Sequence, residues 1–91
     1  MLHIERTTQF KRDLKLAKKR RKDLDQLRHL MQLIQEEKDI PAKHHDHPLV
    51  GNWVGFRELH INPDWLLIYK LIMKEKTVIF TRTGSHSDLF D

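Results

Sequence analysis

The segment Trp65–Ile72 constrains the fold more than any other part of the chain, because it is apolar on both of the faces that a strand would present. One face carries Trp65, Leu67, Tyr69 and Leu71, and the other carries Leu66, Ile68 and Ile72. A strand of this kind must be covered on both sides to keep its apolar side chains from water. We therefore predict that it lies in the centre of a sheet, with a helical layer against at least one side.

Two neighbouring segments have the same strand character. Trp53–Ile61 and Thr77–Thr83 are rich in β-branched and aromatic residues, and only Asn62–Asp64 and Met73–Lys76 separate them from the central segment. Links this short join antiparallel neighbours. At the other end of the sequence, Leu2–Glu5 alternates apolar and polar residues, which predicts a brief edge or near-edge strand.

Between the first strand and the others, apolar residues recur at helical spacing. Residues 8–21 predict an amphipathic helix, with Thr7 or Thr8 as its N-cap. Asp23 can cap a second helix, with Gln26 in a capping-box position. The apolar stripe of the second helix consists of Leu24, Leu27, Leu30, Met31 and Ile34.

The remaining segments are predicted to be irregular. Residues 42–52 contain Pro48 and Gly51 without periodicity and indicate a loop, and the tail from Ser85 to Asp91 is expected to add a helical turn. The patterns together predict one α+β domain over residues 1–91. In it an N-terminal strand and a helical hairpin pack on an antiparallel sheet, in the order β-α-α-β-β-β.

Composition narrows the class of protein. The chain has 91 residues and no cysteine, so its thin core has no disulfide or thiolate zinc site to support it. The N-terminal residues lack the apolar stretch of a signal peptide, and the aliphatic and aromatic run from Trp65 to Tyr69 is too short to span a bilayer. We expect a soluble, cytoplasmic protein that makes no membrane contact.

The positive charge is concentrated near the N-terminus. Residues 1–28 hold ten Lys or Arg against four acidic residues, a net charge of +6, whereas the other 63 residues have a net charge of −2. Such asymmetry favours a polyanion or an acidic protein as partner. A helix face that is merely solvated is the alternative interpretation.

Histidine is unusually frequent, with seven in the chain. Five of them lie in or beside predicted loops and strand ends: His44, His45, His47, His60 and His86. An imidazole exchanges protons near neutral pH, so these positions suggest acid–base catalysis, although scattered histidines are also ordinary surface residues. The run His44-His45-Asp46-His47 has the composition of a metal site, but consecutive ligands in one loop seldom converge on an ion. There is no glycine-rich phosphate loop and no serine or cysteine nucleophile motif.

Three ordered blocks carry a family resemblance. They read DHPLVGNW at 46–53, GFRELHINPDWLLIYK at 55–70 and TRTGSHSDLF at 81–90. The N-terminal FKRD at 10–13 and KLAKKR at 15–20 are similar as well. With these blocks the chain resembles the YafQ branch of the RelE/ParE toxin superfamily over nearly its whole length.

The resemblance implies a bacterial toxin of a type II toxin–antitoxin system, encoded with a neutralising antitoxin. Such a toxin enters the ribosomal A site, cleaves messenger RNA at preferred codons and inhibits translation. The implied fold is a helical hairpin against a twisted antiparallel sheet. The implied site residues are His47, His60, Asp64, Trp65, Arg82, His86 and Phe90.

These residue types suit RNA cleavage by protein groups alone. The 2′-hydroxyl of RNA is an internal nucleophile, so the reaction needs a base, an acid and positive charge on the phosphorane. We assign His60 with Asp64 to proton abstraction, His86 to the general acid and Arg82 to the phosphate. His47 is expected to position the phosphate or to act as an alternative base. No metal and no cofactor are expected.

Binding to RNA is assigned to two further groups. Trp65 and Phe90 are expected to stack on a splayed nucleotide or to shape the site around it. The cations expected to contact ribosomal RNA are Lys11, Lys15, Lys18, Lys19 and Arg21. The expected partners are the cognate antitoxin, the ribosome and messenger RNA, with operator DNA reached only through the antitoxin complex. The alternative is a non-catalytic binder of the same fold, either a ParE-like topoisomerase inhibitor or an RNA-binding module.

Overall fold

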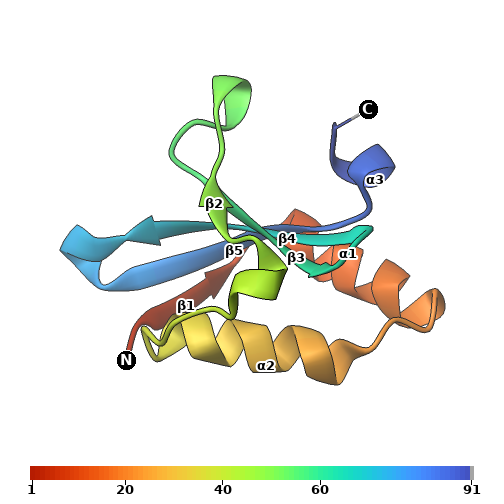
Figure 1. Ribbon diagram of the computed structural model, residues 1–91, viewed down its shortest axis with the longest axis horizontal. Coiled ribbons are helices and arrows are strands. Elements are labelled where there is room, and N and C mark those ends of the chain that lie inside the picture. Colours follow the sequence, from red (N-terminus) through yellow and green to blue (C-terminus); the bar gives the residue numbers. More distant parts are fainter. Residues whose placement is uncertain (91) are drawn as a thin grey trace.

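The computed structural model describes residues 1–90 and contains a five-stranded sheet with helices on both of its faces (Figure 1). The strands are β1 (His3–Arg6), β2 (His47–Pro48), β3 (Arg57–Asn62), β4 (Trp65–Ile72) and β5 (Thr77–Gly84), in the spatial order β1-β5-β4-β3-β2. The α-helices are α1 (Thr8–Lys19), α2 (Leu24–Gln35) and α3 (His86–Phe90), and the described residues also form the 3-10 helices η1 (Ala42–His44), η2 (Gly51–Trp53) and η3 (Met73–Glu75). The predicted α+β class is confirmed, and β4 lies in the centre of the sheet as expected.

One strand departs from the predicted antiparallel arrangement. The pairs β2–β3, β3–β4 and β4–β5 are antiparallel, but β1 pairs with β5 in parallel, with Ile4 opposite Val78. Short links decide the direction of consecutive strands only, and β1 is separated from β5 by most of the chain. The sheet is therefore mixed.

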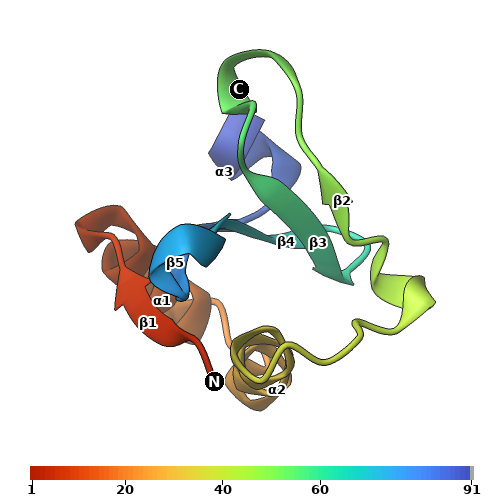
Figure 2. The ribbon, with the colours of Figure 1, turned by 90° about the vertical axis from the view of Figure 1, so that its left-hand side faces the viewer.

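Both faces of β4 are covered by apolar side chains. Leu67 and Tyr69 belong to a buried cluster that α1 and α2 complete with Phe10 and Leu27. On the opposite face, Leu66 and Ile68 form a second cluster, which is completed by Leu89 of α3 and by the partly buried Leu49, Trp53 and Phe56. In Figure 2, α2 is seen end-on below the sheet and α3 lies above it.

The helix caps also tie the helices to the sheet. Thr7 accepts a hydrogen bond from the Phe10 N–H and donates its hydroxyl to the Thr81 carbonyl of β5, at 2.9 and 2.7 Å. Asp23 caps α2 as predicted. Gln26 does not complete a capping box, because its side chain donates to the Ile61 carbonyl of β3 at 3.2 Å.

The predicted strand beginning at Trp53 starts later. Trp53 ends η2, and β3 begins at Arg57. Gly51 and Gly55 have φ angles of 66° and 93°, a conformation that favours glycine, and they turn the chain on either side of Trp53. The loop expected over residues 42–52 contains η1, the short β2 and the start of η2.

The helix α3 is attached to α1 by an ion pair. Asp88 accepts hydrogen bonds from Arg20 Nη1 at 2.7 Å and from the Ser85 N–H at 2.9 Å. These two hydrogen bonds, the one from Arg20 having the larger effect, hold the pKa of the Asp88 carboxyl well below its usual range. Gly84 makes room for this carboxyl, because a Cβ at position 84 would lie 2.9 Å from Asp88 Oδ2. Every helix formed by residues 1–90 is too short or too polar to cross a lipid bilayer.

We expect Asp88→Asn to lower the urea midpoint of unfolding at pH 7 and to have a smaller effect at about pH 3. Because the folded-state pKa of Asp88 is lowered, its pair with Arg20 stabilises the fold above the unfolded-state pKa of about 3.9 and loses that contribution as the pH falls. The asparagine side chain would still accept the hydrogen bond from the Ser85 N–H, so the variant removes the negative charge and keeps this hydrogen bond. Urea unfolding at both pH values checks this, with Asp25→Asn as control because the Asp25–Arg28 pair is solvent-exposed. A destabilisation of equal size at pH 7 and pH 3 would contradict the prediction.

Candidate active site

Polar side chains gather on the face of the sheet that carries α3. The strand register places Glu58 opposite Ile68 and Ile68 opposite Arg82, so these positions share one face. An irregularity in the pairing moves β5 from Phe80, opposite Tyr69, to Arg82, opposite Ile68. Thr81 is thus the extra residue of a bulge, which lets Phe80 remain in the core while Arg82 reaches the other face.

The first group of site residues surrounds Glu58. His47 Nε2 lies 2.9 Å and His60 Nε2 3.9 Å from Glu58 Oε2. The Glu58 residue is only 6% exposed, and its second oxygen, Oε1, has no hydrogen-bond partner among the described residues. His47 Nδ1 also faces the Pro48 carbonyl at 3.0 Å, so a protonated His47 would donate from both ring nitrogens. Glu58 was missed by the sequence analysis, although the two-residue strand period places it on the face of His60.

Ligand atoms of His47, Glu58 and His60 all lie within 4.8 Å of one another, which would suit a metal ion. The four residues of the run His44-His45-Asp46-His47 do not come together in this way. His44 is buried and donates from Nδ1 to the His60 carbonyl at 2.7 Å, and Asp46 is bound by other residues. Within residues 1–90, the potential metal ligands that meet come from two strands rather than from one loop.

Asp46 fixes the loop that precedes His47. Tyr69 Oη donates to both Asp46 oxygens, at 2.7 and 2.8 Å, and Arg57 Nε donates to Oδ1 at 3.3 Å. Burial, together with the hydrogen bond to Asp46, raises the pKa of the Tyr69 hydroxyl, which therefore acts as a donor. This pairing anchors the His-rich segment to the central strand of the sheet.

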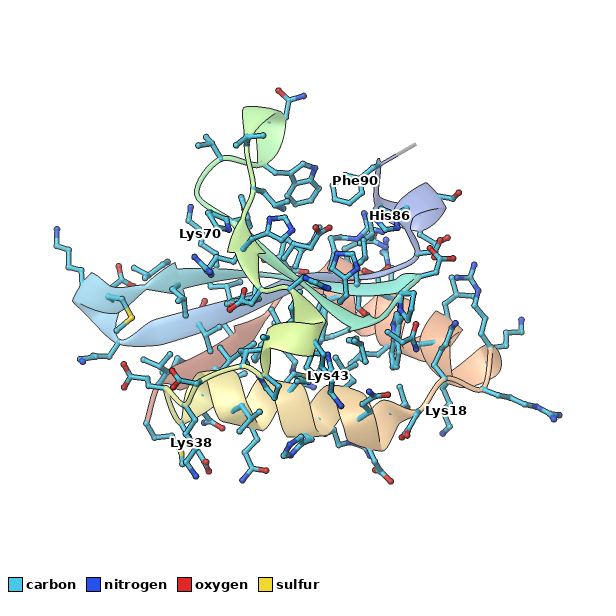
Figure 3. The ribbon with its side chains drawn as sticks, viewed as in Figure 1. Lys18, Lys38, Lys43, Lys70, His86 and Phe90 are labelled. Atoms are coloured by element: carbon cyan, nitrogen blue, oxygen red, sulfur yellow. The ribbon has the colours of Figure 1, made fainter. Side chains whose placement is uncertain are left out.

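His86 connects two parts of the site. Its ring centroid is 5.8 Å from that of His60, and its Nδ1 is 3.4 Å from Asp64 Oδ1. The ring of His45 also approaches His60, with ring centroids 6.0 Å apart. Figure 3 shows His86 and Phe90 together above the sheet, on the side away from Lys18. The structure thus brings four of the five predicted catalytic residues into one neighbourhood, namely His47, His60, Asp64 and His86.

Arg82 lies on the same face but is turned towards α1. Its Nε donates to Asp13 Oδ2 at 2.8 Å and its Nη2 to Asp13 Oδ1 at 3.3 Å. Arg82 and Asp64 line one cleft of about 520 Å³ between α1, the end of β5 and α3. His86 therefore lies between the His47–Glu58–His60 group and the cleft of Arg82, and it contacts Asp64 at the boundary.

The two predicted stacking residues differ in accessibility. Phe90 is 42% exposed and lies 6.1 Å, ring to ring, from Trp53, which sequence analysis had placed in a strand. Trp65 is 1% exposed and belongs to the core cluster below the sheet. Its ring is closed off from any nucleotide, so the expectation that Trp65 stacks on RNA is not supported, and shaping the cleft from below is the role left to it.

The predicted RNA-contacting cations are all exposed. Lys11, Lys15 and Lys18 lie on one face of α1, and Lys19 lies beside them. Arg21 comes shortly after the end of the helix. Among residues 1–90, no ion pair involves any of these five side chains. They present free positive charge on the helical side of the molecule.

Comparison with known proteins shows which family the chain belongs to. The family model described as "Bacterial toxin of type II toxin-antitoxin system, YafQ" matches residues 2–91. The chain is 49% identical over 88 residues to the mRNA interferase toxin YafQ of Escherichia coli K12, an alignment that covers 96% of this chain and 94% of that protein. It is similar to the crystal structure of the E. coli DinJ–YafQ complex, with a TM-score of 0.89, 47% identity and full coverage of both chains. It is also similar to a metal-bound toxin from Helicobacter pylori, with a TM-score of 0.93, 41% identity and coverage of 99% of this chain and 100% of that one.

The fold, together with these comparisons, defines a small α+β toxin of the type II toxin–antitoxin class. Within that class, the chain belongs to the YafQ family.

We expect Tyr69→Phe to destabilise the protein by about 1.5–3 kcal/mol, the usual effect of losing a hydrogen bond to a charged group. The variant leaves the Asp46 carboxylate with Arg57 as its remaining partner among the bonds described above, so the loop carrying His47 should loosen. Chemical denaturation and amide hydrogen exchange of residues 42–48 check this. Phe56→Leu, a substitution in the second apolar cluster, serves as control for general loss of packing. Unchanged exchange in residues 42–48 of Tyr69→Phe would show that Asp46 does not hold the loop through Tyr69.

Proposed function

We propose that this protein is the toxin of a type II toxin–antitoxin system and that it cleaves messenger RNA on the ribosome by metal-independent acid–base catalysis. The observation that carries the proposal is the continuous chain of titratable groups His47–Glu58–His60–His86–Asp64 on an accessible face of the sheet. A protein that only binds a partner does not need such a chain. The mRNA interferase activity of the E. coli relative supports the same reaction.

The geometry suggests how the catalytic roles are divided. His60, with Glu58 beside it, is positioned as the base that takes the proton of the 2′-hydroxyl. His86, oriented by Asp64, is the acid that protonates the departing 5′-oxygen. The sequence analysis assigned Asp64 to His60. We assign it to His86 instead, because the contact of 3.4 Å joins Asp64 Oδ1 to His86 Nδ1. His47 adds positive charge on the other side of Glu58 or serves as the alternative base.

The remaining contacts supply charge and stacking. Arg82 is the cation for the phosphorane, since it shares a cleft with Asp64, the residue in contact with His86. Phe90 is exposed beside Trp53, and the two rings form a surface on which an unstacked base could rest, worth about 1–3 kcal/mol.

The partners follow from the same assignment. The E. coli YafQ structure with DinJ supports a cognate antitoxin as partner of this chain. Lys11, Lys15, Lys18, Lys19 and Arg21 are proposed to contact ribosomal RNA. Their role is affinity rather than chemistry, since four of them lie on α1 and the fifth comes shortly after its end. Operator DNA is proposed to be bound through the antitoxin complex. Because the proposed target is messenger RNA engaged on ribosomes, we assign the protein to the cytoplasm.

We expect His86→Ala to lose about 10²–10⁴-fold in cleavage rate, the usual effect of removing a general acid, while ribosome and antitoxin binding persist. Single-turnover cleavage on programmed ribosomes, compared with the same message free in solution, tests the chemistry and the ribosome dependence together.

His29→Ala is the matched control, because His29 is an exposed histidine of α2 outside the site. A parent protein that cleaves neither substrate would overturn the proposed function. Cleavage by His86→Ala within about threefold of the parent rate would show that His86 is not the acid.

A transition metal would fit the His47, Glu58 and His60 donor set, which offers two imidazoles and one carboxylate. The metal-bound state of the H. pylori toxin supports such binding. An ion there would supply Lewis acidity. In this proposal it would also occupy the lone pair of His60 on which proton abstraction depends, so metal loading and acid–base cleavage would compete.

We therefore expect EDTA-treated, dialysed protein to cleave programmed ribosomes at the untreated rate, and Cu²⁺ or Zn²⁺ to inhibit it. Metal binding, followed by isothermal titration, should weaken in Glu58→Gln. The protein is treated alone and then returned to ribosomes in their normal magnesium buffer. Loss of activity on chelation, with recovery on adding one metal, would replace metal-independent catalysis by a metal-dependent reaction.

A further inference from the structure

Asp13 is the one acidic residue of α1, a helix otherwise rich in lysine and arginine, and it is 7% exposed. A carboxylate removed from water in this way loses several kcal/mol of hydration unless cations and hydrogen-bond donors replace the water. The groups that replace water around Asp13 therefore indicate what the residue does.

Donors from three directions converge on Asp13. Arg82 donates from Nε to Oδ2 at 2.8 Å and from Nη2 to Oδ1 at 3.3 Å, a two-point contact that fixes the plane of the guanidinium. The Thr83 N–H donates to Oδ2 at 3.1 Å, and Gln9 Nε2 donates to Oδ1 at 3.1 Å.

The strand pairing explains why a side chain from α1 can reach β5 here. The β1–β5 pairing stops at Arg6 opposite Phe80, so among the described residues the edge of β5 beyond that point has no neighbouring strand. Asp13 takes the place of the missing strand by accepting the Thr83 N–H. Because Thr83 directly follows Arg82, the same carboxylate fixes both the backbone and the guanidinium at the end of the bulge.

We propose that Asp13 is the positioning residue for Arg82, holding its guanidinium in the orientation that meets the phosphorane. The inference rests on the proposed function of Arg82. A guanidinium has about five N–H donors, and Asp13 engages one on Nε and one on Nη2. The donors on Nη1 and the second N–H of Nη2 stay available to two oxygens of a phosphate. Asp13 and Arg82 line the same cleft as Asp64, the residue in contact with His86.

Electrostatics alone and positioning make opposite predictions for Asp13→Asn. If Asp13 acts only through its charge, removing a negative group beside the phosphate site should strengthen binding and leave or raise the cleavage rate. If it positions Arg82, the rate must fall. An asparagine whose oxygen replaces Oδ2 still accepts the Thr83 N–H and Arg82 Nε, but it presents its amide N–H₂ towards Arg82 Nη2. The variant keeps the size of the side chain, the strand contact and the Nε contact, and it loses the second contact, on Nη2, that fixes the plane of the guanidinium.

Single-turnover cleavage of programmed ribosomes by the full chain tests this, using Asp13→Asn, Arg82→Ala and the double variant. We expect the rate at saturating Asp13→Asn to fall about 10- to 100-fold, the effect of a misplaced catalytic group, with the half-saturating concentration within about threefold of the parent value. In the Arg82→Ala background, Asp13→Asn should have no further effect. Asp25→Asn, the same change at a solvent-exposed ion pair, should cleave like the parent.

A rate for Asp13→Asn within about threefold of the parent, or above it, would overturn the proposal. So would a further loss in the Arg82→Ala background, which would reveal a general structural role for Asp13.

The ¹⁵N–¹H signals of Arg82 Nη2 give a readout that does not depend on cleavage, assigned by their absence from Arg82→Ala. In the parent they should be resolved, because the contact with Asp13 Oδ1 restricts rotation of the guanidinium, and in Asp13→Asn they should broaden or disappear. Unchanged Nη2 signals in the variant would overturn positioning while leaving the proposed function intact. A parent protein whose Nη2 signals are resolved but which cleaves no message would instead overturn the proposed function, and the inference with it.

Discussion

The structure depends on the burial of β4 from both sides. Leu67 and Tyr69 bind the strand to the α1–α2 layer, and Leu66 and Ile68 bind it to α3 and the loop before β3. The second face is only partly covered by helix. Polar residues of the neighbouring strands can therefore surround the apolar side chains Leu66 and Ile68 there. In such surroundings hydrogen bonds and charges act more strongly than in water, which suits a site that must stabilise a charged transition state.

Two ion pairs connect helix α1 to the strand β5 and to the helix α3. Asp13 lies within the helix and Arg20 is its C-cap, about two helical turns further on, so both point towards the same side of α1. Asp13 binds Arg82 on β5, and Arg20 binds Asp88 on α3. One rigid helix thereby sets the distance between the strand that carries the proposed phosphate-binding arginine and the short helix that carries the proposed acid.

The loop between α2 and β3 is attached by a different device. Asp46 is held by the buried Tyr69 of β4, and His44 donates to the β3 backbone. These contacts leave His47 free to meet Glu58 across the β2–β3 pair. Buried polar groups thus fix these parts of the site, which limits the freedom of the proposed catalytic side chains without enclosing them.

The sequence by itself determined the α+β class, the two helices, the central position of β4 and the identity of the titratable residues, because periodicity, caps and motifs are local properties. The local sequence pattern did not determine how distant segments of the chain are placed relative to one another. The parallel β1–β5 pair, the bulge at Thr81 and the pairing of Asp64 with His86 arise from contacts between distant segments. Burial also determined the surroundings of individual side chains. It placed Trp65 in the core and gave distinctive surroundings to Glu58 and Asp13, which look in the sequence like two ordinary acids. Tertiary structure decided these points because the surroundings of a charge depend on what folds over it, and local pattern does not contain that information.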